Sequence, residues 1–303
     1  RLCQTGTPKE NHLGSLRALF YFLTPGVFYS QEIVNKKYRH PIEKRGDQQL
    51  RQKLVNRIKP FILRRLKTDV AKELPEKTTI EVNIDMNDQQ SKLYEAVRAT
   101  MQASIQKIVA EKGFKRSQIQ ILDALLKLRQ VCCHPSLLKL DSVKSGQAHS
   151  AKLEQLMDMV VPMVEEGRKI LIFSQFTSML ELIAQQLDHA EIGYVKLTGQ
   201  TKKRDEVITA FQSGQVPVFL ISLKAGGVGL NLTTADTVIH YDPWWNPAAE
   251  DQASDRAWRI GQDKPVFVYK LITNKSIEEK ILALQQNKAE LAHSILSTDH
   301  EGE

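Results

Sequence analysis

The chain is poor in cysteine and has no long apolar run. Three cysteines among 303 residues are too few for a disulfide framework. Cys132 and Cys133 are adjacent and precede His134, a spacing that suits zinc poorly, so we interpret them as small buried side chains that end a helix before Pro135. This cysteine usage fits an intracellular, reducing compartment. No apolar run approaches the roughly 18 to 20 residues of a membrane span, so we expect no membrane partner.

Two further absences concern nucleotide chemistry. The phosphate-binding pattern G-x-x-x-x-G-K-[ST] does not occur, and no adjacent pair of acids follows a strand-like run to hold Mg²⁺. A nucleoside triphosphatase that lacks the P-loop lysine and the metal carboxylate has neither a phosphate cradle nor a metal ion. The chain also opens at Arg1, with no methionine and no signal pattern. We therefore expect a piece of a longer protein that does not hydrolyse ATP alone.

Acidic residues are scarce in the first half of the chain. Residues 1–150 carry 27 Lys and Arg against 14 Asp and Glu, a net charge of +13, whereas residues 151–303 carry 15 against 21, a net charge of −6. Together they give the overall charge of +7. A basic half favours a polyanion partner, and the alternative is a solvated basic face.

In the second half, near-continuous apolar runs alternate with amphipathic helical segments. We expect strands at 170–173, 194–197, 218–222, 237–241 and 266–271, and helices at 151–165, 177–188, 202–212, 248–258 and 276–296. This alternation is typical of a parallel α/β sheet with helices on both faces, and such sheets bind ligands outside the carboxyl ends of their strands. Upstream, residues 78–88 alternate like one more strand, and 89–112 and 119–133 predict an antiparallel helical pair.

The stretch 222–262 holds the residues that favour a nucleotide function. Its glycine-rich turn at 226–229 follows an apolar strand, where backbone N–H groups can approach a phosphate closely. Helical spacing predicts that Gln252, Asp255, Arg256 and Arg259 share one helix face. Two arginines one turn apart can reach one polyphosphate. The alternative is a surface helix in which Asp255 pairs with Arg259.

Taken together, these motifs resemble the Swi/Snf-like DNA translocases of helicase superfamily two. The wording of GGVGLNL (226–232), DPWWNP (242–247) and DQASDRAWRIGQ (251–262) is similar to motifs five, five-a and six of that family. KILIFSQF (169–176) resembles motif four, and TGTPKEN (5–11) resembles motif three. FILRRLKTDVAKELPEK (61–77) and LLKLRQVCCHP (125–135) resemble its inter-lobe and second-lobe blocks. The resemblance covers almost the whole chain in the family's order.

The resemblance implies a RecA-like second motor lobe with roles for particular residues. Arg256 and Arg259 match the arginines that reach the γ-phosphate of ATP. The positions that match nucleotide-facing residues are Gln252, Gly229 and Asn231. Those that match contacts to the DNA backbone are Ser174, Gln175, Thr198, Gly199, Ser222 and Lys224. Those that match residues coupling the two sites are Thr5, Gly6, Thr7, Trp244 and Trp245.

Some of these positions could have a purely structural role. Ser222 could serve only as a strand-end cap, and the tryptophan pair could be core, since Trp is mostly buried. Leu223 departs from the threonine of many relatives and lacks its hydroxyl.

By the same resemblance, residues 1–25 are the edge of a first RecA-like lobe and 26–77 a basic helical inter-lobe linker. Residues 78–303 are then the second lobe, with a helical insertion at 89–140.

The function that the resemblance implies is that of an ATP-dependent double-stranded DNA translocase. Its partners would be duplex DNA, the first lobe and a DNA-bound protein target, with ATP and Mg²⁺ bound mainly by the first lobe. Two alternatives stay open: an RNA helicase lobe of the same superfamily, and a non-catalytic DNA- or protein-binding module. The compact helical insert and the VCCHP wording are closer to bacterial members. We therefore expect a cytoplasmic, nucleoid-associated protein, or a nuclear one if the source is eukaryotic.

Overall fold

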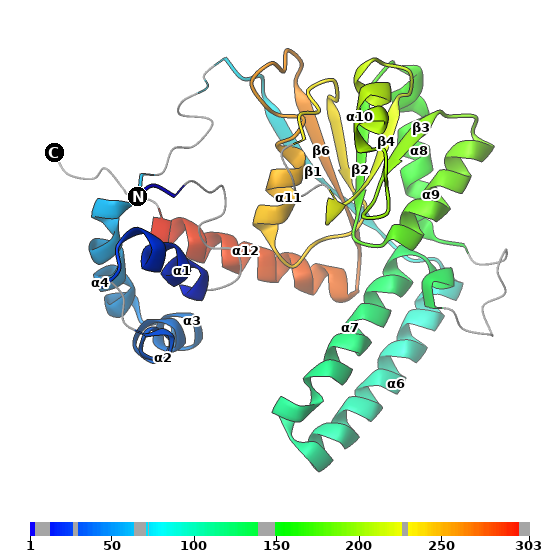
Figure 1. The fold of residues 1–303 in the computed structure, drawn as a ribbon. Helices are drawn as coiled ribbons and strands as arrows, with labels where there is room; N and C mark the ends of the chain where they lie inside the picture. The colour runs from blue at the N-terminus through cyan, green and yellow to red at the C-terminus, as the bar shows by residue number, and fades with distance from the viewer. Residues whose placement is uncertain are drawn as a thin grey trace. The chain divides into compact units, whose positions relative to one another are not determined.

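The computed structural model of the chain describes residues 1–3, 13–26, 30–63, 71, 73–138, 149–225 and 230–296 (Figure 1). It forms two compact units. The larger unit comprises Leu74–Trp245 and Ala253–Ala283, and the smaller comprises Arg1–Glu73, Asn246–Gln252 and Leu284–Glu303. None of the helices in the described ranges has the length and hydropathy that a membrane span requires.

The larger unit is built on one parallel sheet. Within the described residues its six strands are β1 (Lys77–Ile84), β2 (Ile170–Ser174), β3 (Tyr194–Leu197), β4 (Val218–Ser222), β5 (Thr237–His240) and β6 (Val266–Thr273). They lie in the order β1-β6-β5-β2-β4-β3, and every pairing is parallel. All carboxyl ends therefore meet at one edge of the sheet.

The central strands read as continuous apolar runs because both faces of the sheet are covered. Every residue of β2, β4 and β5 is buried. Ile170 and Ile172 of β2 pack on one face, and Leu171 and Phe173 pack on the other. Side chains that alternate along a strand in this way fill two separate cores.

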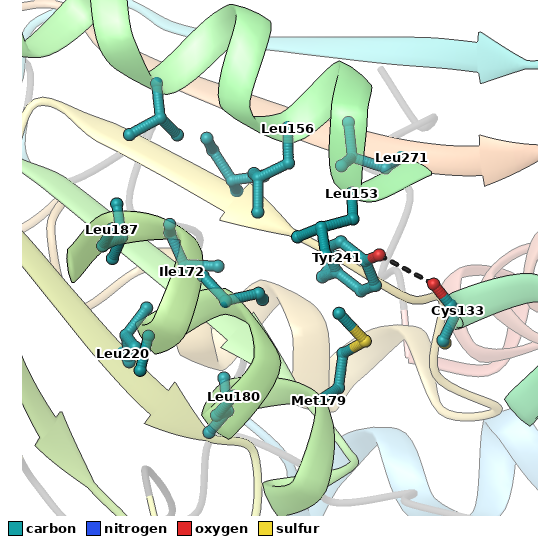
Figure 2. Packing of buried hydrophobic residues seen from close by; sticks show 14 of the residues in the cluster. Cys133, Leu153, Leu156, Ile172, Met179, Leu180, Leu187, Leu220, Tyr241 and Leu271 are labelled. Atoms are coloured by element: carbon teal, nitrogen blue, oxygen red, sulfur yellow. Dashed lines mark hydrogen bonds between the residues drawn. The ribbon is translucent and has the colours of Figure 1, made fainter. Parts of the chain in front are cut away.

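Helices α8 (Ala151–Glu165) and α9 (Thr177–His189) cover the first face, and α10 (Arg204–Gln212) covers the second. Figure 2 shows the first core, where leucines of both helices interlock with Ile172, Leu220 and Leu271 of the sheet. The Tyr241 hydroxyl donates a hydrogen bond to the Cys133 carbonyl at 2.8 Å. This bond ties the C-terminal end of the helix that ends at Cys133 to the loop that follows β5.

Two long helices, α6 (Asp88–Lys112) and α7 (Gln118–Cys133), lie side by side and extend away from the sheet (Figure 1). Asn87 caps α6 by accepting from the Gln90 N–H at 2.8 Å. The buried Gln90 side chain donates to the Val131 carbonyl at 2.8 Å, which fixes the two helices to each other. Cys132 and Cys133 end α7 fully buried, as the sequence predicted.

The smaller unit contains short helices. They are α1 (Leu13–Leu23), α2 (Gln31–Val34), α3 (His40–Arg45) and α4 (Gln48–Ile58), with a π-helical segment at Asn35–Arg39. Leu16, Phe20 and Leu54 belong to its apolar core. The described residues also form the α-helices α11 (Pro247–Ser254) and α12 (Ile277–Leu296) and short 3-10 helices at Lys59–Phe61, Phe114–Ser117 and Pro135–Leu138.

The predicted fold class, a RecA-like α/β sheet with helices on both faces, is confirmed. One predicted element is wrong in a way that matters for the site. The helix expected over 248–258 ends at Ser254, and residues 255–261 form turns.

Candidate functional site

Four loops form a row along the carboxyl edge of the sheet. Because β5, β2, β4 and β3 are successive neighbours, the loops that follow them are neighbours too. They carry Asp242–Trp245 after β5, Ser174–Gln175 from the last residue of β2, Ser222–Lys224 from the last residue of β4, and Thr198–Gly199 after β3. Ser174 pairs with Ser222 in the β2–β4 register. The structure thus brings the predicted DNA-contact residues to one edge.

Asp242 joins the first two loops of this row. Its Oδ1 accepts hydrogen bonds from Ser174 Oγ at 2.6 Å and from the Gln175 N–H at 3.3 Å. Gln175 Nε2 donates to the Pro243 carbonyl at 2.7 Å. Burial raises the pKa of Asp242 to about 6, although the hydrogen bond from Ser174 and the positive charge of Arg129 both lower it. Ser174 is fully buried, so its hydroxyl holds a loop in place.

The other two loops present more exposed groups. Lys224 and Gly199 are exposed, whereas Ser222 is buried and its Oγ accepts from the Ala225 N–H at 3.3 Å. Arg204 Nη2 donates to the Ala225 carbonyl at 2.6 Å. The cap at Ser222 therefore shapes the turn that presents Lys224.

Gly199, in the loop after β3, has room for a side chain. A Cβ at this position would meet no atom within 4 Å, and its φ lies outside the left-handed range that favours glycine. Neither packing nor backbone conformation therefore requires glycine here. The missing side chain leaves the backbone open to close approach by another molecule.

The two predicted catalytic arginines lie on the turn that follows α11. The prediction that they share a helix face with Gln252 and Asp255 is wrong, because α11 ends at Ser254 and the Arg256 N–H donates to the Ala253 carbonyl, three residues back instead of four. The Arg256 carbonyl accepts from the Leu232 N–H at 3.0 Å. Asp255 Oδ1 lies 3.3 Å from Lys77 Nζ. The helix is thus replaced by a turn that is anchored to the segment after β4.

Arg256 and Arg259 form a compact cationic pair. Arg259 Nη1 donates to the Leu230 carbonyl at 3.3 Å. Arg256 is 7% exposed, and its Nε finds no hydrogen-bond partner among the described residues. Burial, and then the charge of Arg259, lower the pKa of Arg256. A buried guanidinium beside a second positive charge favours an anionic ligand.

Three residues that sequence reasoning did not single out hold this turn. Trp258 Nε1 donates to the Pro75 carbonyl at 2.8 Å, and Lys77 Nζ lies 4.6 Å from the Trp258 ring centroid. The buried Gln262 side chain donates to the carbonyls of Thr233, Ala235 and Ala257 at 2.7 to 3.0 Å. The wording of the motif at 251–262 contains Trp258 and Gln262, and the block at 61–77 ends at Lys77, but neither resemblance assigned these residues a role.

Other predicted residues are distributed as follows. Asn231 is exposed, and its carbonyl accepts from Gln212 Nε2 at 2.6 Å, next to the segment that contacts both arginines. Gln252 is exposed on α11 and belongs to the smaller unit. Trp244 and Trp245 are half-buried. The predicted site residues Thr5, Gly6, Thr7 and Gly229 lie outside the described residues.

Family models match most of the chain. The one described as "SNF2-related domain" matches residues 1–137, and the one described as "Helicase conserved C-terminal domain" matches residues 151–261. The second match contains all four carboxyl-edge loops and the arginine turn.

Curated relatives are similar along nearly the whole chain. The "Putative ATP-dependent helicase/translocase YwqA" of Bacillus subtilis is 37% identical over 98% of this chain. Human "SWI/SNF-related matrix-associated actin-dependent regulator of chromatin subfamily A member 1" is 37% identical over 96% of it. The chain spans only 32% and 28% of the length of these two relatives.

Solved structures of Sulfolobus solfataricus proteins share the fold. The "SWI2/SNF2 ATPase core in complex with dsDNA" is 36% identical, with a TM-score of 0.59, and the match covers 97% of this chain and 64% of that one. The "SWI2/SNF2 ATPase C-terminal domain" is 34% identical, with a TM-score of 0.58, over 73% of this chain and 90% of that one.

Proposed function

This chain belongs to the SNF2 family of helicase-like ATPases, and we propose that it supplies the second motor lobe of an ATP-dependent double-stranded DNA translocase. The observation that carries the proposal is the pairing of Arg256 and Arg259 beside the segment after β4, in a sheet whose carboxyl edge carries four loops suited to a phosphate backbone.

In this proposal Arg256 and Arg259 stabilise the charge that develops on the γ-phosphate of ATP. Arginine suits that role because its planar fork binds phosphate in two places and stays charged when partly buried. The unsatisfied Nε of Arg256 supports the idea that a ligand completes this turn. By the family resemblance, we assign nucleotide contacts to Gly229, Asn231 and Gln252.

The DNA strand runs along the carboxyl edge of the sheet. Gln175, Thr198, Gly199 and Lys224 meet the phosphates directly, while the buried Ser174 and Ser222 hold their loops in shape. Thr5, Gly6, Thr7, Trp244 and Trp245 couple this edge to the nucleotide. A solved relative that contains double-stranded DNA supports duplex DNA as the substrate.

The remaining half of the ATP site lies outside this chain. In the described residues no group of three or more His, Cys, Asp and Glu side chains is placed to hold a metal ion, so these residues do not fit a Mg²⁺ site. The sequence also contains no P-loop lysine. We assign both to a first RecA-like lobe, consistent with relatives about three times as long as this chain.

The test is ATP hydrolysis by the full-length gene product, with no nucleic acid, with duplex DNA and with duplex RNA, beside the 303-residue chain. Stimulation of the full-length protein by DNA, with silence from the 303-residue chain, is the expected result. Stimulation by RNA alone would move the protein to the RNA helicases. Hydrolysis by the 303-residue chain itself would overturn the split site.

A further inference from the structure

Arg129 of α7 reaches into the row of loops from outside the sheet. It is only 7% exposed, and its guanidinium carbon lies 5.4 Å from the Phe176 ring centroid and 5.6 Å from the Trp245 ring centroid. Its Nη2 lies 3.7 Å from Asp242 Oδ2. One side chain of the helical pair thus contacts the loop after β2 and the loop after β5.

The type of residue matters at this position. A guanidinium is flat and delocalised, so it can lie against aromatic rings while its edge faces a carboxylate, which a lysine ammonium does not reproduce. Burying a charge is costly unless it is paired. In the described residues neither Arg129 Nη2 nor Asp242 Oδ2 has a hydrogen-bond partner, and the two opposite charges lie 3.7 Å apart.

Asp242 transmits the position of Arg129 to the DNA edge. One carboxylate oxygen faces Arg129, and the other accepts from Ser174 Oγ and the Gln175 N–H. A displaced carboxylate would release Gln175 and the tryptophan loop together. The position of α7 is therefore linked to both loops through a single buried side chain.

We propose that Arg129 is a positioning residue, which holds the loops carrying Gln175 and Trp245 in the arrangement that grips DNA. The helical pair then acts as a brace for the grip, and changes in the pair alter DNA engagement. This inference deepens the proposed function and rests on it for its DNA readout.

The first experiment measures DNA-stimulated ATP hydrolysis by full-length protein as the DNA concentration is varied. For Arg129→Met we expect the half-saturating DNA concentration to rise about tenfold, with the maximal rate within about threefold of the unsubstituted protein. Arg129→Lys keeps the positive charge but loses the planar group that lies against the aromatic rings. Its half-saturating DNA concentration should therefore fall between those of the unsubstituted protein and Arg129→Met. The matched control is Arg98→Met on α6, whose guanidinium pairs with Glu95 at the surface and which should stay within about twofold.

Two results would overturn the inference while the protein remains a DNA-stimulated ATPase. One is a half-saturation within about twofold of the original for Arg129→Met, and the other is a loss confined to the maximal rate. If Arg129→Met does not fold, the same criteria apply to Arg129→Lys. Absence of stimulation in the unsubstituted protein would instead reject the proposed function.

A second experiment requires no DNA. The full-length protein carries Trp244→Phe and Trp258→Phe, so that Trp245 is the tryptophan that remains in these 303 residues. Quenching of its fluorescence by acrylamide then reports the exposure of Trp245. The signal of any tryptophan elsewhere in the protein is measured in a Trp245→Phe reference and subtracted. Arg129→Met should raise the quenching constant about twofold because the loop loses its stacking partner, and Arg98→Met should not. Equal quenching in the two variants would overturn the positioning role whatever the substrate proves to be.

Discussion

At the scale of single residues, a substitution at Arg259 tests ATP hydrolysis without changing the residues proposed to contact DNA. It lies on the turn after α11 and contacts the Leu230 carbonyl. An arginine supplied to a transferring phosphoryl group contributes about 10³ to 10⁵ in rate in other nucleotide hydrolases. We expect Arg259→Ala in the full-length protein to lower the DNA-stimulated kcat for ATP hydrolysis by at least about 100-fold. Arg168→Ala is the control, because Arg168 lies outside the arginine turn and pairs with Glu166. An unchanged kcat in Arg259→Ala would remove the catalytic assignment.

The buried carboxyl of Asp242 makes stability depend on pH. Its pKa is about 6 in the folded protein, against 3.8 for an aspartate in water, because burial disfavours the charged form. The folded state therefore binds the proton more tightly than the unfolded state, and stability rises as pH falls through 6. Above pH 6 the buried carboxylate is charged, and its burial lowers the free energy of unfolding by the full amount. This destabilisation decreases as the pH falls from 6 to 3.8.

For a carboxyl with this shift, we expect the Asp242 contribution to the free energy of unfolding to gain about 1 kcal/mol between about pH 7.5 and about pH 5. Burial lowers the pKa of His134 to about 4, which changes stability in the opposite direction over this range, so the Asp242 contribution is read as the difference between the original protein and Asp242→Asn. Asp242→Asn should abolish that gain. All three tryptophans of the chain lie in the larger unit, so fluorescence-detected urea unfolding of the 303-residue chain follows the unit that contains Asp242. An identical pH dependence in both proteins would contradict the assignment.

A motif suggested roles for particular residues, whereas contacts between distant parts of the chain could not be predicted. The positions of Arg256 and Arg259 were found from spacing, although the helix assumed for them was wrong. Arg129 carried a weak signal, as a charge among the apolar positions of α7. Its partner Asp242 follows another strand far along the sequence, so no local pattern joins the two.

At the scale of elements, the strands were predictable because their burial is complete. β2, β4 and β5 carry apolar side chains on both faces, and this reads as an unbroken run in the sequence. The end of α11 was not predictable, because the helical spacing of the polar residues continues past Ser254, whereas the Arg256 and Ala257 N–H groups bond only three residues back. The turn that replaces the helix contacts a distant segment through the bond from the Leu232 N–H to the Arg256 carbonyl.

The loop after β3 offers a test of the DNA edge that leaves the fold intact. Gly199→Ala adds a methyl group into open space, so the free energy of unfolding should change by less than about 0.5 kcal/mol. If a phosphate backbone passes close to this loop, the same substitution should weaken duplex DNA binding by the full-length protein about fivefold or more.

The matched control is Gly214→Ala, which lies at the other end of the neighbouring strands. Its φ of 79° strains any side chain, so stability should fall while DNA affinity stays the same. Fluorescence anisotropy of labelled DNA and urea unfolding measure the two properties. A Gly199→Ala protein with unchanged affinity would place the DNA elsewhere.

At the scale of the whole molecule, the order of the strands assembles a site that no single segment contains. The sequence placed each polar pair after a strand, but only the order β5-β2-β4-β3 shows that the four loops form one row. A row of backbone and short polar groups, with Lys224 exposed, suits the repeating phosphates of a strand better than the edges of bases.

Binding of duplex DNA should therefore depend on salt and hardly on base sequence. Each phosphate neutralised by a basic side chain contributes about −0.9 to the slope of log affinity against log salt concentration. Three such contacts would weaken binding roughly 40-fold between about 50 and 200 mM salt. Lys224→Gln should make the slope about one unit shallower and reduce affinity equally for unrelated sequences. Affinity that instead followed base sequence, with a slope near zero, would show that the row of loops reads bases, and the motor assignment would lose its support at this edge.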